Sequence, residues 1–291
     1  MSSPFEEITD LAPSPSVPGR YEGIVGESWS LRPFPQGGAL AVASAAAMSR
    51  ELSDPAQRLR LVHTTFVAPV EVGPIEVDVE VVRRGRSMSH LRSVLRNVGG
   101  PPGSLTTAVF GAPRRGFEFT DLEPPAGFIA LAESRSFRAP RPPEAGEDTP
   151  NPFWERVLEG RGALGHPPWE DYVPDRAEHG TWYRLDEPPM RDDGTQDPLA
   201  LLVYADTMPG AVGEKVGPTE RGGWFGPSVD FTCHLFSAPT SEWVFGHNRA
   251  RFAGDGYGSL DMAIWDFGAD GTSPGRLCAY GTQVCFFAFD S

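Results

Sequence analysis

The stretch Gln36–Leu52, which reads QGGALAVASAAAMSREL, indicates the fold class of this chain. After its first three residues it consists almost entirely of helix-favouring residues, and Asp54-Pro55 follows it as a helix stop. A strand is expected before it, over 21–31. Four extended segments are expected after it, and two of them alternate apolar with polar residues, as strands with one wet face do. These four segments are 61–67, 75–83, 87–95 and 104–110.

A second unit of the same kind begins near residue 181. A strand is expected over 181–185, and Asp197-Pro198 then opens a helix that reads LALLVYADTMPGAV. Pro209 should end or kink this helix, because proline lacks the amide hydrogen that the next turn needs. One such unit alone would leave an open sheet edge, so two units are expected to cover each other. Four extended segments complete the second unit, at 228–236, 242–251, 257–267 and 277–289.

Between the two units the periodic pattern gives way to proline, glycine and charged residues, most clearly in APRPPEAGEDTPNP at 139–152. No regular element can be predicted there. We therefore divide the chain into an N-terminal unit, 1–118, a connection, 119–180, and a C-terminal unit, 181–291.

The composition narrows the classes of partner. The 291 residues are 40% hydrophobic, enough for a sizeable core, and 25 Lys and Arg against 39 Asp and Glu give a net charge of -14. This acidic balance argues against nucleic acid and anionic membranes as partners, because both attract positive charge. The first residues, MSSPFEEITDL, do not form a targeting signal, and no apolar stretch approaches the about 18 residues of a membrane helix. We therefore expect a cytoplasmic protein that contacts no membrane.

The sequence lacks the motifs of several familiar enzyme classes. The sequence contains no G-x-S-x-G nucleophile elbow, no Walker loop and no H-E-x-x-H helix, and the glycines at 254–258 lack dinucleotide-binding spacing. The six histidines show no close metal-ligand spacing, and the three cysteines are odd in number without a C-x-x-C pair. We expect neither a metal nor a cofactor, and we interpret Cys233, Cys278 and Cys285 as packing residues.

Several short motifs, each a weak indicator of family on its own, occur along the chain in an order that together indicates one protein family. On them, the chain resembles the double-hotdog acyl-CoA thioesterases, the type-II enzymes and their thioesterase-like relatives, over nearly its whole length outside the connection. The resemblance implies an α+β fold, a tandem (double) hotdog with two antiparallel sheets that each wrap a long helix and join as in a hotdog dimer. The motifs are Gln36-Gly37-Gly38, Phe66-x-x-Pro69, Gly73-Pro74, Val82-Arg83-Arg84-Gly85-Arg86-Ser87, Tyr204-Ala205-Asp206, Ser228-Val229-Asp230, Glu242-Trp243 and Gln283 on the last strand.

The resemblance also implies hydrolysis of acyl-CoA by an activated water, without a covalent intermediate. Carried over by position, the catalytic residues are Asp206, Gln283 and Ser228, where the family has threonine. One carboxylate can suffice, because a thioester carbonyl is electrophilic and its thiolate leaves readily. Ser228 and Gln283 could fix the hydrogen-bonding directions of the water, although serine lacks the methyl group that restricts the rotamer of threonine. The first unit is expected to supply pocket walls rather than chemistry.

Two groups of residues could bind the CoA part of the substrate. Gly37 and Gly38 expose backbone amides at a helix N-terminus, which favours an anion, but glycine there could equally allow close contact between helix and sheet. Arg83, Arg84 and Arg86 could meet the CoA phosphates at a turn between strands, or could simply be solvated.

Two other functions remain open alternatives. The first is a non-catalytic double-hotdog protein that binds an acyl thioester or an apolar metabolite. The second is a hotdog dehydratase or hydratase, although no G-D-x-N-P-x-H-like segment occurs. The acyl length, the choice between CoA and an acyl-carrier protein, and association into a homo-oligomer through exposed sheet edges are also open.

Overall fold

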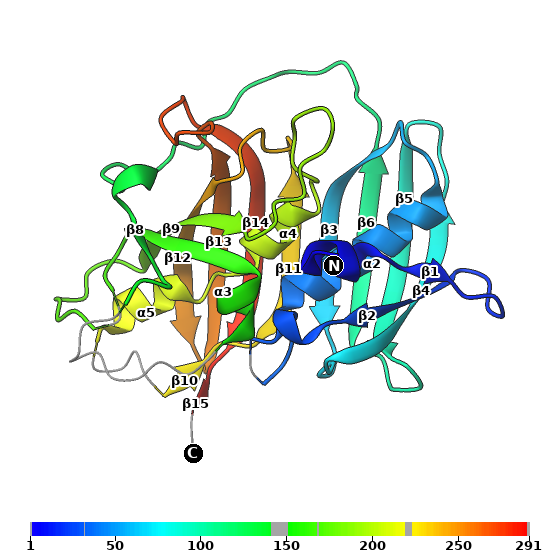
Figure 1. The fold of residues 1–291 in the computed structure, drawn as a ribbon, viewed down its shortest axis with the longest axis horizontal. Helices are drawn as coiled ribbons and strands as arrows, with labels where there is room; N and C mark the ends of the chain where they lie inside the picture. Colours follow the sequence, from blue (N-terminus) through cyan, green and yellow to red (C-terminus); the bar gives the residue numbers. More distant parts are fainter. Residues whose placement is uncertain (1, 32, 141–150, 168, 219–222, 290–291) are drawn as a thin grey trace.

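The computed structural model describes residues 2–31, 33–140, 151–167, 169–218 and 223–289. The fold is built on one large antiparallel sheet with helices on its inner face (Figure 1). The elements of the N-terminal half are α1 (Pro4–Thr9), β1 (Ala12–Pro13), β2 (Arg20–Val25), α2 (Gly37–Leu52), β3 (Arg58–Phe66), β4 (Gly73–Arg83), β5 (Met88–Asn97) and β6 (Ser104–Gly111). Those that follow are β7 (Arg135–Ser136), α3 (Pro152–Arg156), β8 (Leu158–Leu164), β9 (Glu178–Leu185), α4 (Ala200–Ala205), α5 (Gly210–Val216), β10 (Trp224–Phe225), β11 (Ser228–Leu235), β12 (Val244–Gly254), β13 (Tyr257–Asp266), β14 (Arg276–Phe286) and β15 (Ala288–Phe289).

The strand order confirms the repeat of two units. In the first half the strands pair in the order β2-β4-β5-β6-β3, and in the second half in the order β9-β12-β13-β14-β11. Each half therefore consists of a strand, helical structure and four further strands, paired in the same way.

The two expected sheets are joined into one continuous sheet, because β3 and β11 pair with each other. Thr232 lies opposite His63 in this antiparallel pair, and the sheet continues through it as a single sheet of 13 strands. Each half would otherwise leave one of these strands as an open edge. Figure 1 shows the two strands side by side at the centre of the molecule.

The two halves differ in their helices. In the first half, the 16-residue α2 packs against β3, β4, β5 and β6. In the described residues of the second half, and contrary to expectation, two short helices replace one long helix: α4 has six residues and α5 has seven. The break falls at Asp206, which is the C-cap of α4, and Pro209 precedes the first residue of α5. None of the described helices is both long and apolar enough to cross a membrane.

The connection contains more structure than the sequence predicted. Its β8 pairs with β9 and extends the sheet, although the run LEGRGAL has no strand period. Upstream, Phe128 and Leu131 pack on the outer face of the second half against Trp182 and Phe245. The sheet of the second half is therefore covered on both faces.

Candidate active site

Asp206 lies where the end of α4 meets the start of α2. Its side chain is buried, and Oδ2 accepts a hydrogen bond of 2.6 Å from the backbone amide of Gly38. The approach is close enough to require glycine, since a Cβ on Gly38 would lie 2.5 Å from the carbonyl oxygen of Leu202. A Cβ on Gly37 would lie 2.6 Å from the ring of Phe66. These glycines allow close packing, and the Gly38 amide already meets an anion of the chain itself.

A β-bulge brings Ser228 to the same face of the sheet as Gln283. Gln283 on β14 is buried opposite Phe231 of β11. Ser228 precedes Phe231 by three residues, so in a regular strand the two would face opposite sides. The register shifts by one residue between Ser228 and Asp230, which turns Ser228 inward. The carboxylate of Asp230 accepts a hydrogen bond of 2.8 Å from the backbone amide of Val284 and thereby supports the bulge.

The three side chains Asp206, Ser228 and Gln283 meet. Gln283 Nε2 donates one hydrogen bond of 2.8 Å to Asp206 Oδ1 and another to the hydroxyl of Ser228. Both amide hydrogens are thus used, while the buried Oε1 of Gln283 has no hydrogen-bond partner among the described residues. A buried carbonyl oxygen of this kind needs a donor, and a water molecule could supply one.

The environment of Asp206 adjusts its ionisation. Burial raises the pKa of Asp206 to about 7, although hydrogen bonds from Gly38, Gln283 and Ser228 oppose the rise. The carboxyl group is therefore partly ionised near neutral pH, where it could accept a proton from water.

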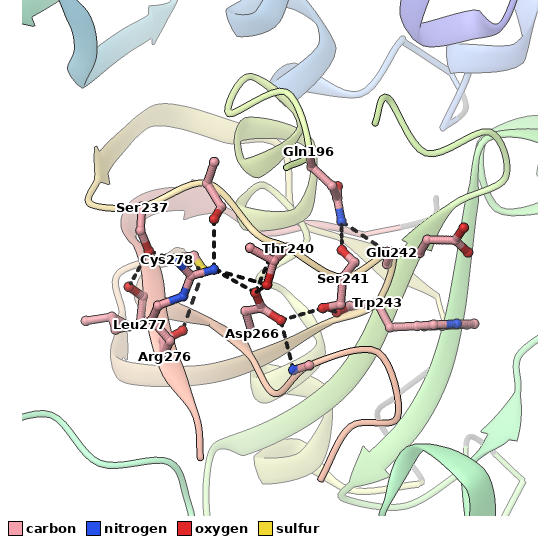
Figure 2. Close-up of polar contacts among 12 residues, drawn as sticks. Gln196, Ser237, Thr240, Ser241, Glu242, Trp243, Asp266, Arg276, Leu277 and Cys278 are labelled. Carbon is pink, nitrogen blue, oxygen red and sulfur yellow. Dashed lines mark hydrogen bonds and ion pairs between the residues drawn. The ribbon is translucent and has the colours of Figure 1, made fainter. Parts of the chain in front are cut away.

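A second buried aspartate, Asp266, has a lowered pKa, in contrast to the raised pKa of Asp206. Figure 2 shows Asp266 and its partners. Burial alone would raise the pKa of Asp266, but hydrogen bonds from Ser241, Thr240 and Arg276 outweigh it and lower this pKa to about 2. Asp266 therefore stays ionised and fully bonded, and it anchors the loop before β12.

The arginine cluster lies away from these three side chains. Arg84 donates hydrogen bonds of 2.6 Å and 3.2 Å to the carbonyl oxygens of Leu52 and Glu51, at the C-terminus of α2. The 16 residues of α2 separate this end from Asp206 by about 24 Å. Arg83 and Arg86 are exposed at the same turn, between β4 and β5.

Two contributions of the first half differ from the sequence-based expectation. The Gly38 amide, a candidate contact for an anion of the substrate, donates instead to the Asp206 carboxylate of the second half. The side chain of Gln36 also joins the two halves, because its Nε2 donates to the carbonyl oxygens of Val203 and Asp206. A polar residue directly before two glycines at a helix start was the only available signal.

A surface cavity lies elsewhere. It has a volume of about 620 Å³, and none of the three converging side chains lines it. The lining residues of this cavity are Arg60, Phe117, Glu118, Phe119, Thr120, His234, Leu235 and Phe236.

No group of three metal-ligating side chains occurs within the described part of the chain. The three cysteines are buried free thiols.

Comparison with solved structures shows a shared hotdog fold. A hotdog-fold protein of unknown function from Alicyclobacillus acidocaldarius is 22% identical, with 100% of both chains covered and a TM-score of 0.78. An acyl-CoA thioesterase II from Mycobacterium marinum is 21% identical, with 99% of each chain covered and a TM-score of 0.70. No curated protein matches the chain.

Comparison with protein families identifies both halves. Residues 25–111 match the acyl-CoA thioesterase N-terminal domain, and residues 136–287 match the acyl-CoA thioesterase C-terminal domain. The second match begins within the connection and includes β8. Because these matches span most of the chain in the order of the repeated fold, the chain belongs to the acyl-CoA thioesterase family.

Proposed function

We propose that this protein hydrolyses acyl-CoA thioesters to a free carboxylic acid and CoA. The observation that carries the proposal is the convergence of Asp206, Ser228 and Gln283 from the end of α4 and two neighbouring strands. Membership of the family supports thioester hydrolysis, and these side chains supply a base and two polar groups that can orient a water. In this proposal the single sheet consists of two hotdog units fused at β3 and β11.

In the proposed reaction, one water donates a hydrogen bond to the Asp206 carboxylate and another to the unpartnered Oε1 of Gln283. Asp206 takes a proton as the water oxygen bonds to the thioester carbonyl carbon, and the Ser228 hydroxyl helps to hold the water in place. The tetrahedral intermediate then collapses, the bond between carbon and sulfur breaks, and the proton held by Asp206 passes to the departing thiolate. A pKa near 7 suits both proton transfers.

The CoA part of the substrate would extend away from Asp206. Its phosphates lie far from the thioester, so a contact with Arg83 and Arg86 at the distant turn between β4 and β5 is compatible with this site. Arg84 and the Gly38 amide already have partners within the chain. We therefore assign the Gly38 amide to Asp206 rather than to the substrate. The neighbouring Gly37 amide stays a candidate for contact with the substrate.

The test is an assay of thiol release from acyl-CoAs of several chain lengths. We expect turnover by the native chain and a fall in kcat of roughly 10²- to 10⁴-fold in Asp206→Asn. Asp193→Asn is the matched control, because Asp193 is exposed and accepts its hydrogen bonds from Thr195 of its own loop among the described residues. Unchanged turnover in Asp206→Asn would remove the proposed base.

The alternative is a non-catalytic protein that binds acyl thioesters. The serine at position 228, where the family has threonine, is the observation in its favour. Calorimetry that shows tight acyl-CoA binding without any thiol release would establish this alternative and refute hydrolysis.

A further inference from the structure

Gln36 is a buried side chain whose hydrogen bonds connect the two halves. It is 2% exposed. Its Oε1 accepts a bond of 3.0 Å from the backbone amide of Ala39, and its Nε2 donates bonds of 2.9 Å to the carbonyl oxygen of Val203 and 3.1 Å to that of Asp206. Both amide hydrogens and the amide oxygen are therefore used.

These partners lie at helix ends, where backbone groups lack the full set of bonds within the helix. The Ala39 amide belongs to the first turn of α2 and also donates a bond of 3.2 Å to the backbone oxygen of Gln36. The carbonyls of Val203 and Asp206 lie at the C-terminus of α4. A cap at the start of a helix needs only a side-chain oxygen, which serine supplies as well. The two bonds to α4 are additional, and only a side chain of this length with an amide can make all three.

The bridge lies directly beside the bond between Gly38 and Asp206. Gln36 holds the backbone oxygen of Asp206, while the amide of Gly38, two residues along the chain, donates to the carboxylate of the same aspartate. The two bonds fix Asp206, the C-cap residue of α4, to the start of α2 at both its main chain and its side chain.

We propose that Gln36 is a positioning residue, which holds the Gly38 amide against the Asp206 carboxylate by linking the start of α2 to the end of α4. The inference rests on the proposed function only for its kinetic readout. Gln36 itself has no hydrogen-bonding group left for a substrate, apart from the second lone pair of its oxygen.

Two substitutions separate positioning from helix capping. Gln36→Met keeps the length of the side chain but removes all three bonds, whereas Gln36→Ser keeps a cap for the Ala39 amide but cannot reach α4. Without the bridge, Asp206 should lose the Gly38 donor that favours its ionised form. In both variants we expect the acid limb of the pH profile of kcat to move up by about one pH unit, with kcat at pH 7 about fivefold lower, KM within twofold and most of the loss recovered at pH 9.

The matched control is Gln196→Met. Gln196 is also fully buried, accepts a hydrogen bond from Tyr204 of α4 and donates to the carbonyl oxygens of Ser241 and Glu242 (Figure 2). Its loss should lower the melting temperature as Gln36→Met does, but should leave the pH profile in place. An unmoved profile in Gln36→Met, or a profile of Gln36→Ser that equals that of the native chain, would refute positioning and leave only capping.

A titration followed by ¹³C NMR decides the inference independently of turnover. The carboxyl carbon of Asp206, assigned by its loss in Asp206→Asn, should titrate about one pH unit higher in Gln36→Ser than in the native chain. If the native chain hydrolyses no thioester but this shift occurs, the proposed function fails and the role of Gln36 stands. If hydrolysis occurs but the titration does not shift, the role of Gln36 fails alone.

Discussion

The backbone amide of Gly38 and the carboxylate of Asp206 are 168 residues apart in the chain and form a hydrogen bond of 2.6 Å. This bond places the positive end of the α2 dipole at a buried carboxylate whose pKa burial raises to about 7. Neither half therefore contains the complete site. The second half supplies Asp206, Ser228 and Gln283, and the first half supplies a donor that favours the ionised form of Asp206.

The first prediction concerns the close approach at Gly38. In Gly38→Ala the new methyl group would lie 2.5 Å from the carbonyl oxygen of Leu202 and 3.0 Å from Cβ of Asp206, so α2 and α4 must separate. We expect a loss of about 1–3 kcal/mol in the free energy of unfolding and a fall in kcat of about 10- to 100-fold. Urea denaturation and the thiol-release assay measure the two effects.

Gly116→Ala is the control for this substitution, because nothing lies within 4 Å of a Cβ at Gly116. It should leave both stability and kcat unchanged. If Gly38→Ala behaves in the same way, the helices do not depend on this close contact.

The second prediction is that the free energy of unfolding depends on pH through the titration of Asp206. Its folded-state pKa, about 7, lies above the ordinary aspartate pKa of 3.8, so the folded chain holds a proton that the unfolded chain releases. The resulting stability is fully present below pH 4 and is lost as the pH rises towards 7, by roughly 4 kcal/mol in total. Activity should change in the opposite direction, because the ionised carboxylate is the base.

Urea denaturation at pH 4.5 and pH 8 measures this effect. The difference between native chain and Asp206→Asn isolates it, because the amide cannot titrate and other groups cancel. Equal pH dependence in the two proteins would show that the pKa of Asp206 is not raised.

The sequence was sufficient for those features that local pattern determines. The strand alternation and the alanine-rich helix predict the element order of both halves, whereas Asp206, Ser228 and Gln283 follow from the resemblance to the acyl-CoA thioesterases. Period and composition act over a few residues, so they identify elements well. They could not predict that β3 pairs with β11, because this pairing depends on the meeting of two distant edges.

The unpredicted features of the site are also long-range. Gln36 bonds to residues 167 and 170 positions away, and nothing in its own neighbourhood indicates these partners. The bulge at Ser228 depends on the register with β14, and the strand β8 depends on its pairing with β9, since its glycines disfavour a strand locally. Each of these features requires a tertiary partner.

The third prediction concerns the bulge in β11. In Asp230→Ala the backbone amide of Val284 loses its acceptor, which costs about 1–3 kcal/mol if the amide stays buried, and Ser228 is no longer held inward. We expect kcat to fall about tenfold with KM little changed. Asp230→Asn retains an acceptor oxygen and should restore most of both quantities. If Asp230→Ala keeps the native kcat, the side chain does not orient Ser228.

The last prediction separates the three arginines at the turn between β4 and β5. Arg84 caps the carbonyls of Leu52 and Glu51, so Arg84→Ala should cost about 1 kcal/mol of stability and leave KM unchanged. Arg83 and Arg86 are exposed on a chain with a net charge of -14, where a guanidinium offers local attraction to phosphate. Replacing both by alanine should therefore raise KM for acyl-CoA about 3- to 10-fold. An acyl-pantetheine substrate, which lacks the nucleotide, should show no such change. The same KM increase for both substrates, or for neither, would mean that this turn is simply solvated and that the phosphates of CoA bind elsewhere.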